Sequence, residues 1–309
     1  MAIRPDITTL FNGLAVEKDQ PMATFTSFRV GGPADLLGRP ETVEDLLSMV
    51  KTARKAQIPV TIFGGGTNTL VSDKGIRGLV IILSSFKQGV EQESPGKKPQ
   101  DTKVTISALT GERLATLCKY ALEKGFSGLE WAAGIPGTLG GAIIMNAGSF
   151  KGDMSQVIKK VEILNLQTLE IETLKKDELN FSYRKLELEN IILLRAQLLL
   201  EQADPELVRS AHEVNLKAKR STQPVSMASG GCFFKNPSQD KPAGWLIEQA
   251  GLKGFKLNGA MVSDLHANFI VNHENAQCKD ILALKQVVQE RVYEKFGIKL
   301  NAEVKTIGD

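Results

Sequence analysis

A short glycine-flanked turn around Cys232 is the part of the sequence in which residue types and spacing most directly suggest chemistry. The cysteine is preceded by Gly230 and Gly231 and followed by Phe233-Phe-Lys-Asn-Pro237. Glycine lets the backbone approach a ligand closely, and the Asn-Pro step ends the run in a turn. A thiol in such a turn could act as a nucleophile or as a proton donor, whereas most free cysteines are small buried hydrophobic residues. These residues alone leave both interpretations of Cys232 open.

Two glycine-rich loops elsewhere in the chain could bind a phosphate group through their backbone N–H groups. The first is Gly64-Gly-Gly-Thr-Asn68, and the second runs from residue 133 to residue 148. Several N–H groups presented to one anion suit a diphosphate and suggest a nucleotide cofactor, although glycine clusters more often mark tight turns. The glycines at positions 134, 137 and 140 do not fit the fingerprint G-x-G-x-x-G, and no P-loop lysine follows either loop. An ordinary Rossmann or Walker site is therefore not expected.

Arg184 and Glu303 are two charged residues that allow both a chemical and a structural interpretation. Arg184 ends the run Phe181-Ser-Tyr-Arg184, and its planar guanidinium group suits a carboxylate or a developing enolate. Glu303 lies among apolar neighbours near a terminal strand, where partial burial would raise the proton affinity of its carboxyl group. A surface arginine and an exposed glutamate on an edge strand are the alternatives.

Among the three histidines, only His266 precedes a segment, Ala267-Asn-Phe269, that suggests a site. A nucleophilic pair would require His266 and Cys232 to meet in the fold, which the sequence leaves open. No second histidine or acid stands at metal-ligand spacing, so no metal site is expected.

The composition is typical of a globular protein, and a length of 309 residues suggests two or three domains. The net charge of +3 is too small to indicate nucleic-acid binding but is compatible with an anionic small molecule. The three cysteines are widely spaced and form no CxxC pair, which fits a reducing compartment. The sequence shows no signal-peptide pattern and no apolar run of membrane-spanning length, so we expect a cytoplasmic protein without membrane contact.

The spacing of apolar residues predicts the elements that must position these groups. Helices are expected at residues 42–57, 112–124, 205–220, 243–250 and 279–296, and strands at 58–63, 79–83, 103–108, 157–166, 191–200, 269–271 and near Val304. Cys118 lies on the apolar face of the second helix and is expected in a core. The polar segment 91–102 predicts an exposed connection. A boundary near residue 202 would leave a small α+β unit after it.

A series of motifs follows in a fixed order along the chain. It consists of Thr26-Ser-Phe-Arg-Val-Gly-Gly-Pro-Ala34, Gly64-Gly-Gly-Thr-Asn68, Gly134-Ile-Pro-Gly-Thr-Leu-Gly-Gly141, Asn146-Ala-Gly148, Ser182-Tyr-Arg184, Gly231-Cys-Phe-Phe-Lys-Asn-Pro237, His266-Ala-Asn-Phe269 and Glu303-Val304. In this order the motifs resemble those of the bacterial UDP-N-acetylenolpyruvoylglucosamine reductases over about residues 26–308. The length of the chain is similar to that of the compact form of the family.

The resemblance implies an α+β flavoprotein in two parts. A two-part FAD-binding region of the vanillyl-alcohol-oxidase (PCMH) type is expected at residues 1–202, with lobes at about 1–85 and 86–202, followed by a C-terminal α+β substrate-binding domain at 203–309. NADPH would reduce FAD, and the flavin would pass hydride to the enolpyruvyl group of a UDP-sugar to give UDP-N-acetylmuramate for peptidoglycan synthesis. The implied FAD-binding residues are Gly64, Gly65, Gly66, Thr67, Asn68, Gly134, Ile135, Pro136, Gly137, Thr138, Gly140, Gly141, Asn146, Ala147 and Gly148.

The resemblance also implies catalytic roles. Arg184 and Glu303 match the family's enolate-stabilising pair, and Cys232 takes the position of the proton donor, which is normally a serine. A thiol has an ordinary pKa of about 8.5 and donates a proton more readily than an alcohol, but a thiolate cannot donate at all. The implied substrate-binding residues are Arg220, Lys235, Asn236, His266 and Asn268.

Two other functions fit parts of this pattern. Another FAD-dependent oxidoreductase on the same scaffold, such as an oxidase of alcohols or hydroxy acids, would share the cofactor loops without requiring Glu303 together with the cysteine turn. A non-catalytic nucleotide-binding protein would keep the loops and leave Cys232 as a core residue or redox sensor. For the reductase, a monomer is expected.

Overall fold

The computed structural model describes residues 7–93, 102–150, 152–238 and 240–309, and the chain falls into two compact units. Unit 1 comprises residues 1–16, 38–65 and 81–218, and unit 2 comprises residues 17–37, 66–80 and 219–309. Two segments from the first third of the chain therefore group with its last third. The functional domains expected at 1–202 and 203–309 stay a prediction, because compactness alone does not show which ligand a unit binds.

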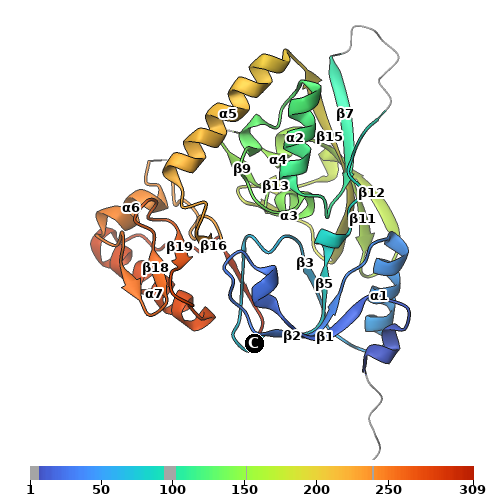
Figure 1. Cartoon of the computed structure of the whole chain (residues 1–309), viewed down its shortest axis with the longest axis horizontal. Coiled ribbons are helices and arrows are strands. Elements are labelled where there is room, and N and C mark those ends of the chain that lie inside the picture. Colours follow the sequence, from blue (N-terminus) through green and yellow to red (C-terminus); the bar gives the residue numbers. More distant parts are fainter. Residues whose placement is uncertain (1–6, 94–101, 151, 239) are drawn as a thin grey trace, which may run out of the picture. The chain divides into compact units, whose positions relative to one another are not determined.

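Unit 1 is built around a six-stranded antiparallel sheet (Figure 1). Its strands are β6 (Val90–Gln92), β7 (Lys103–Leu109), β8 (Phe126–Ser127), β11 (Ile158–Asn165), β12 (Ile171–Lys175) and β15 (Ile191–Gln202). The strand order is β12-β11-β15-β7-β6, and β8 pairs with β15 outside this path. Val161 and Ala196 lie opposite each other and are buried in the core, whereas Lys160 and Gln197, one position away, lie on the other face of the sheet.

Helices cover the apolar face of this sheet. Residues of α2 (Leu114–Lys124) and α3 (Leu139–Ile144) share one buried cluster with residues of β7, β11 and β15, and Figure 1 shows both helices beside these strands. Cys118 of α2 is buried in that cluster, with its sulfur 3.8 Å from the Leu129 carbonyl oxygen. The core position predicted for this cysteine is confirmed.

The remaining elements of unit 1 include a helix whose N-terminal cap is recognisable in the sequence. The hydroxyl of Thr42 accepts the N–H of Asp45 at 3.0 Å, and the Asp45 carboxylate accepts the N–H of Thr42 at 3.1 Å, which caps α1 (Val43–Lys55). The other short elements are η1 (Ile7–Phe11), β3 (Val60–Phe63), η3 (Leu83–Ser85), η4 (Glu130–Ala132), β9 (Gly148–Ser149), β10 (Gly152–Asp153), α4 (Met154–Val157), η5 (Lys176–Glu178), β13 (Phe181–Ser182) and β14 (Lys185–Leu186). Helix α5 (Pro205–Thr222) begins in unit 1 and ends in unit 2.

Unit 2 contains a four-stranded antiparallel sheet with two helices. The strands are β16 (Ala228–Ser229), β17 (Lys256–Leu257), β18 (Ala260–Val262) and β19 (Ile270–Asn272), in the order β16-β19-β18-β17. Helices α6 (Ala243–Gln249) and α7 (Cys278–Phe296) share a buried cluster with Phe28, Leu70, Phe233 and Val304, which come from four separate parts of the sequence. The unit also holds η2 (Met22–Phe25), most of β1 (Val16–Pro21), β2 (Pro33–Gly38) and β5 (Ile76–Ile82), and a parallel pair formed by β4 (Thr69–Val71) and β20 (Lys305–Ile307).

The predicted helices and strands are confirmed to within a few residues at their ends. The connection predicted at 91–102 lies mostly outside the described residues, and its first two residues belong to β6. Helix α3 was not expected, because it lies inside a segment interpreted as a glycine-rich loop. Within the described ranges, no helix has both the length and the apolar character that a bilayer crossing requires.

Candidate active site

The two glycine loops meet in unit 1 by direct contact of their backbones. A Cβ atom added at Gly65 would lie 2.8 Å from the Cα of Gly137, and one added at Gly64 would lie 2.9 Å from the hydroxyl oxygen of Thr138. Real side chains do not tolerate such distances, so both positions require glycine. The first loop then passes from unit 1 into unit 2 between Gly65 and Gly66.

Hydrogen bonds within unit 1 fix the shape of the second loop. The N–H of Gly140 donates to the Thr110 carbonyl oxygen at 2.8 Å, and the N–H of Gly141 donates to the Thr138 hydroxyl at 3.3 Å. The Thr138 side chain thereby caps the short helix α3. The N–H groups of Gly140 and Gly141 therefore donate within the protein, and the close contact of Gly65 with Gly137 joins the two loops that could lie against a phosphate-bearing cofactor.

Arg184 lies at a two-residue turn between β13 and β14, and we call residues 181–186 the arginine turn. Its backbone has φ of 57°, a left-handed conformation that is uncommon for a residue with a long side chain. The Nη2 of Arg184 donates to the Gly148 carbonyl oxygen at 2.7 Å, and the guanidinium carbon lies 5.1 Å from the centre of the Tyr183 ring. The charged group is therefore held in one direction from a strained backbone, as is typical of functional sites.

Asn146, predicted to bind the cofactor, anchors the arginine turn instead of projecting into solvent. Its side chain is buried, its Nδ2 donates to the Ser182 carbonyl oxygen at 3.1 Å, and its Oδ1 accepts the N–H of Ser155 at 3.0 Å. The same short segment supplies the Gly148 carbonyl that holds Arg184. The Asn146-Ala-Gly148 motif thus has a visible structural task, and any contact that it makes with FAD stays a prediction.

In unit 2, the backbones that carry Cys232 and Glu303 lie side by side. The N–H of Glu303 donates to the carbonyl oxygen of Phe233 at 2.8 Å, directly beside the cysteine. The Nδ2 of Asn68 donates to the Glu303 carbonyl oxygen at 3.2 Å, and the N–H of Lys305 donates to the Asn68 carbonyl oxygen at 3.0 Å. Three motifs that are far apart in the sequence therefore meet: the first glycine loop, the cysteine turn and the Glu303 segment.

Asn268 holds the cysteine turn in place through both ends of its buried amide. Its Oδ1 accepts the N–H of Phe234 at 2.9 Å, and its Nδ2 donates to the Phe234 carbonyl oxygen at 2.8 Å. The N–H of Phe233 also donates to the main-chain oxygen of Asn268 at 2.7 Å. Cys232 itself is half-buried and packs against Met261, Phe269 and Val271. Asn268 was predicted as a substrate ligand, and the structure gives its side chain a positioning task.

The other predicted substrate residues also lie in unit 2 and differ in how they are held. The Oδ1 of Asn236 accepts the N–H of Ala243 at the start of α6 at 3.0 Å, and the N–H of Lys235 donates to the Asn301 carbonyl oxygen at 2.8 Å. Arg220 is exposed near the end of α5. A substrate role for each of these residues stays a prediction.

His266 is a partly buried neutral group. Its Nδ1 accepts the N–H of Asn268 at 3.2 Å, and its ring lies edge-on to Phe269 with 5.0 Å between the ring centres. Burial lowers the pKa of the imidazole from 6.5, and the charge of Lys253 acts in the same direction. The lowered pKa favours the neutral imidazole, and the accepting Nδ1 places the proton of that neutral form on Nε2.

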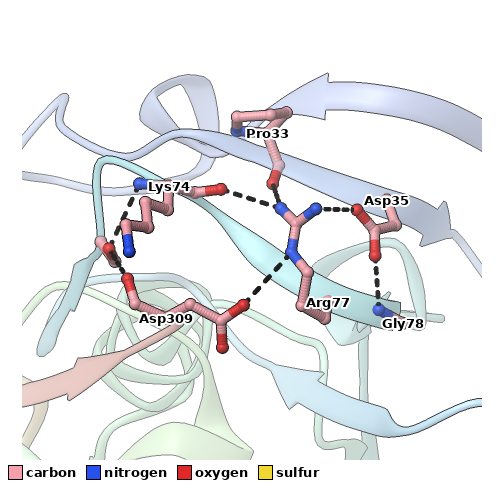
Figure 2. Close-up of polar contacts among 7 residues, drawn as sticks. Pro33, Asp35, Lys74, Arg77, Gly78 and Asp309 are labelled. Carbon is pink, nitrogen blue, oxygen red and sulfur yellow. Dashed lines mark hydrogen bonds and ion pairs between the residues drawn. The ribbon is translucent and has the colours of Figure 1, made fainter.

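An ion-pair network fixes the segment that follows Glu303 (Figure 2). Arg77 pairs with the Asp35 carboxylate at 2.5 Å and with the Asp309 carboxylate at 3.6 Å, and it donates to the carbonyl oxygens of Pro33 and Lys74. Asp35 also accepts the N–H of Gly78 at 3.0 Å. Because the Arg77 side chain is half-exposed, each ion pair adds little stability by itself, and β20 is held beside β4 by its own parallel backbone pairing.

The structure brings some predicted residues together and leaves others in separate units. Arg184 and Gly134–Gly148 of the second loop belong to unit 1, and Cys232, Glu303 and the predicted substrate residues belong to unit 2. Sequence reasoning missed Ser27, whose hydroxyl donates to the Ser229 carbonyl oxygen at 2.5 Å, although the residue lies inside a recognised motif. Among the described residues, no group of three histidines, cysteines or acids could hold a metal ion.

Comparison with known proteins identifies the class first. The family model described as an FAD binding domain matches residues 34–173, and the model described as the C-terminal domain of UDP-N-acetylenolpyruvoylglucosamine reductase matches residues 223–307. Together with the glycine loops that meet in unit 1, these matches define an FAD-binding oxidoreductase with a separate C-terminal domain.

Full-length relatives identify the family. The chain is 41% identical over 310 residues to a UDP-N-acetylenolpyruvoylglucosamine reductase of Desulfosudis oleivorans, covering 98% of this chain and 97% of that protein. It is 40% identical over 297 residues to the reductase of that name from Clostridioides difficile, covering 95% of this chain and 94% of that protein. The crystal structure of the enzyme from Thermus caldophilus matches with a TM-score of 0.78 at 33% identity, over 96% of this chain and 100% of that one. The chain belongs to the UDP-N-acetylenolpyruvoylglucosamine reductase family, and the predicted fold, FAD cofactor and family are confirmed.

Proposed function

We propose that this chain reduces UDP-N-acetylenolpyruvoylglucosamine to UDP-N-acetylmuramate with Arg184 and Glu303 as enolate-stabilising residues and Cys232 as proton donor. Family membership makes the chain an FAD-dependent reductase of peptidoglycan precursor synthesis that uses NADPH as co-substrate. The assignment of roles to individual residues is the further step. The contact of the Glu303 backbone with Phe233, next to Cys232, is the observation that carries it.

The two joined glycine loops suit an FAD molecule. No Cβ fits at Gly64 or Gly65 because the second loop fills that space, so the two loops pack closely and would present their remaining backbone N–H groups to one cofactor. The predicted residues of the two loops would hold the cofactor there. FAD, when bound, supplies hydride to the enolpyruvyl double bond.

Arg184 would stabilise the negative charge that hydride addition leaves on the substrate. A guanidinium group stays charged at all physiological pH values and offers donors in a rigid fork, which suits the two oxygens of an enolate. The bond to the Gly148 carbonyl orients the group before substrate arrives. Such orientation lowers the cost of reaching the transition state.

Glu303 and Cys232 would act on the same substrate carbons from unit 2. A carboxyl group stabilises an enolate only when it is protonated and can donate a hydrogen bond, so this role requires a protonated Glu303 at the moment of hydride transfer. The Cys232 thiol would then give its proton to the carbon next to the substrate carboxylate. The adjacent backbones of the two residues support this division of tasks.

Anaerobic stopped-flow absorbance tests the proposal. The purified yellow protein is reduced with NADPH and then mixed with UDP-N-acetylenolpyruvoylglucosamine. Rapid flavin reoxidation by that substrate is the expected result, and reduced flavin that persists until oxygen is admitted would point to an oxidase or a non-catalytic binder.

The pH profile of Cys232→Ser tests the proton donor. If Cys232 donates the proton, substrate-dependent reoxidation by the parent protein should fall at a lower pH than in the serine variant, because a thiolate cannot donate. The serine variant should keep its activity to higher pH. Identical profiles for both proteins would remove Cys232 from the proton-transfer step.

We further infer that the enzyme acts as a cytoplasmic monomer on soluble substrates. The small net charge of +3 supports an absence of nucleic-acid partners. Sedimentation velocity of the FAD-loaded protein tests the oligomeric state, and a dimer at micromolar concentration would contradict it.

A further inference from the structure

Two lysines face each other across neighbouring strands on the sheet face opposite the core of unit 1. Lys160 of β11 lies directly opposite Lys175 of β12, and Gln197 of β15 lies opposite Lys160 on its other side. Residues paired in this way point to the same face of an antiparallel sheet, so the two lysine side chains start from neighbouring positions, and both line one cavity. Like charges in this arrangement repel and destabilise the pair unless an anion lies between them.

A β-bulge adds a third lysine to the same place. The register of β11 against β15 shifts between Ile158 and Lys160, so Lys159 is an extra residue on β11. Bulges redirect side chains, and here they allow two successive lysines to line one surface. The Nζ of Lys159 lies 3.1 Å from the hydroxyl oxygen of Thr105 on β7, which directs the side chain across the sheet.

The lysines line a cavity of about 740 Å³. Lys159, Lys160 and Lys175 contribute to it together with Lys176 and Asp177 from η5 and with Gln197. The lining therefore carries four positive charges and one negative charge. The nearby Glu178 carboxylate accepts the N–H of Lys175 at 2.8 Å, so it also lies close to the cavity.

The opposite edge of the same sheet face shows a different use of charge. There Arg195 pairs with the Glu91 carboxylate at 3.6 Å, and Gln197 donates to the Glu93 carboxylate at 3.0 Å. Because Gln197 also lines the cavity, the Glu93 carboxylate lies beside it, and the lining itself holds four lysines and one carboxylate. A cavity with this excess positive charge and with flexible ammonium groups suits an anion of high charge density.

We propose that this lysine cavity is a second binding site, separate from the reductase machinery, for a group with two or more closely spaced phosphates. Four ammonium groups can contact several phosphate oxygens at once, and Gln197 can donate a hydrogen bond to one of them. A bound polyphosphate also removes the repulsion between Lys160 and Lys175. The phosphates come either from a free polyphosphate or nucleotide, or from a phospholipid headgroup.

Calorimetric titration of the FAD-loaded protein with inorganic tripolyphosphate tests the proposal. The variant Lys160→Gln/Lys175→Gln should bind about tenfold more weakly or not at all, since two charge-assisted contacts are lost. The control Lys51→Gln/Lys119→Gln removes two exposed lysines from α1 and α2 that do not line the cavity, and it should bind like the parent protein. Substrate-dependent flavin reoxidation should be equal in all three proteins, which separates this site from any diphosphate bound at the reductase site.

A second arm distinguishes the two sources of phosphate. Phosphatidylcholine vesicles with and without cardiolipin are sedimented with the parent protein and both variants. Cardiolipin-dependent sedimentation that the cavity variant loses would assign the site to a lipid headgroup, and tripolyphosphate binding without sedimentation would assign it to a free ligand. Equal affinity of the cavity variant and the control for both probes, or no binding of either probe by the parent protein, would overturn the proposal.

Thermal unfolding gives a check that does not depend on a measurable heat of binding. In buffer free of phosphate, Lys175→Gln should unfold at a higher temperature than the parent protein, because the repulsion from Lys160 is removed. Tripolyphosphate should raise the unfolding temperature of the parent protein more than that of the double variant. A tripolyphosphate shift of the same size in both proteins would again overturn the proposal.

Discussion

The arginine turn of unit 1 and the cysteine turn of unit 2 present catalytic residues in two different ways. In unit 1, the side chain of Arg184 is itself fixed by the Gly148 carbonyl, and one buried amide, that of Asn146, ties its turn to the rest of the unit. In unit 2, the backbone beside Cys232 is fixed from two sides, by Asn268 and by the N–H of Glu303. The first unit orients a side chain, and the second orients a piece of backbone.

This difference follows from the chemistry that each unit supplies. A guanidinium group on a long side chain loses much conformational freedom when it is fixed, so an additional carbonyl contact and a strained backbone are needed to direct it. A cysteine has a single rotatable bond to its sulfur, and fixing its backbone almost fixes the thiol. The comparison predicts that variants of Arg184 and of the amide that holds its turn chiefly change catalysis, and that variants of Asn268, which holds the backbone of the cysteine turn, chiefly change stability.

Arg184→Lys should have the largest effect on turnover. The lysine keeps the charge but loses the rigid fork, so the rate of substrate-dependent flavin reoxidation should fall about 100-fold. Reduction of the flavin by NADPH should be affected much less. Stopped-flow measurement of both half-reactions gives the two rates separately.

Arg195→Lys is the matched control, because this arginine lies in unit 1 and its side chain pairs with Glu91 on the sheet face opposite the core. Its two half-reactions should match those of the parent protein. If Arg184→Lys slowed both half-reactions equally, the side chain would be a general structural element, and the contrast between the two turns would disappear.

Asn268→Ala should have the largest effect on stability. Its loss leaves a buried N–H and a buried carbonyl of Phe234 without their side-chain partner, at a cost of about 2–4 kcal/mol in the free energy of unfolding. Urea unfolding followed by circular dichroism measures this cost. Asn236→Ala, which removes one exposed cap of α6, should cost about 1 kcal/mol or less. Equal losses in the two variants would show that the buried amide does not hold the cysteine turn.

Asn146 offers a sharper comparison, because amide and backbone effects can be separated. Asn146→Ala removes the bonds to Ser182 and Ser155 and also places alanine at φ of 39°, whereas Asn146→Gly removes the same bonds without backbone strain. The alanine variant should be less stable than the glycine variant by about 1 kcal/mol. Both variants should lower the rate of the substrate half-reaction by about tenfold through a looser arginine turn. If both variants reacted at the rate of the parent protein, the Asn146 amide would not be needed to orient Arg184.

Much of the fold could be predicted from the sequence because its elements repeat apolar residues at regular intervals. Helix α1 has an apolar face and a capping pair, Thr42 and Asp45, which lie within one turn of each other. Helix α3 was not predicted because glycines occupy its first turn. The helix begins there because the Thr138 side chain caps its first turn. Local signals were sufficient only where the stabilising contacts were themselves local.

The candidate site was predictable in its reactive residues and not in its supporting ones. Cys232, Arg184 and Glu303 stand out by residue type and by motif, whereas the partners of Asn146 and Asn268 lie up to 36 positions away in the chain. The lysine cavity depends on a bulge and on the register of β11 with β12, which no pattern in the sequence specifies. Whether an asparagine side chain binds a ligand or a backbone group of the protein depends on contacts between residues distant in the sequence.

The smallest expected effect concerns the histidines of the two units at acid pH. Burial lowers the pKa of His266 and also that of His212, but Glu130 and Glu213 oppose the shift at His212. Above the ordinary value of 6.5, folded and unfolded imidazoles are both neutral and stability does not depend on them. As the pH falls below that value, the unfolded chain takes up the proton first, so the free energy of unfolding decreases until the folded imidazole is protonated as well. His266→Gln should therefore flatten the decrease of stability below about pH 6.5, as measured by urea unfolding at several pH values, and His212→Gln should do so as well. An unchanged slope in His266→Gln would mean that this imidazole does not contribute to the acid sensitivity of the unit that holds the cysteine turn.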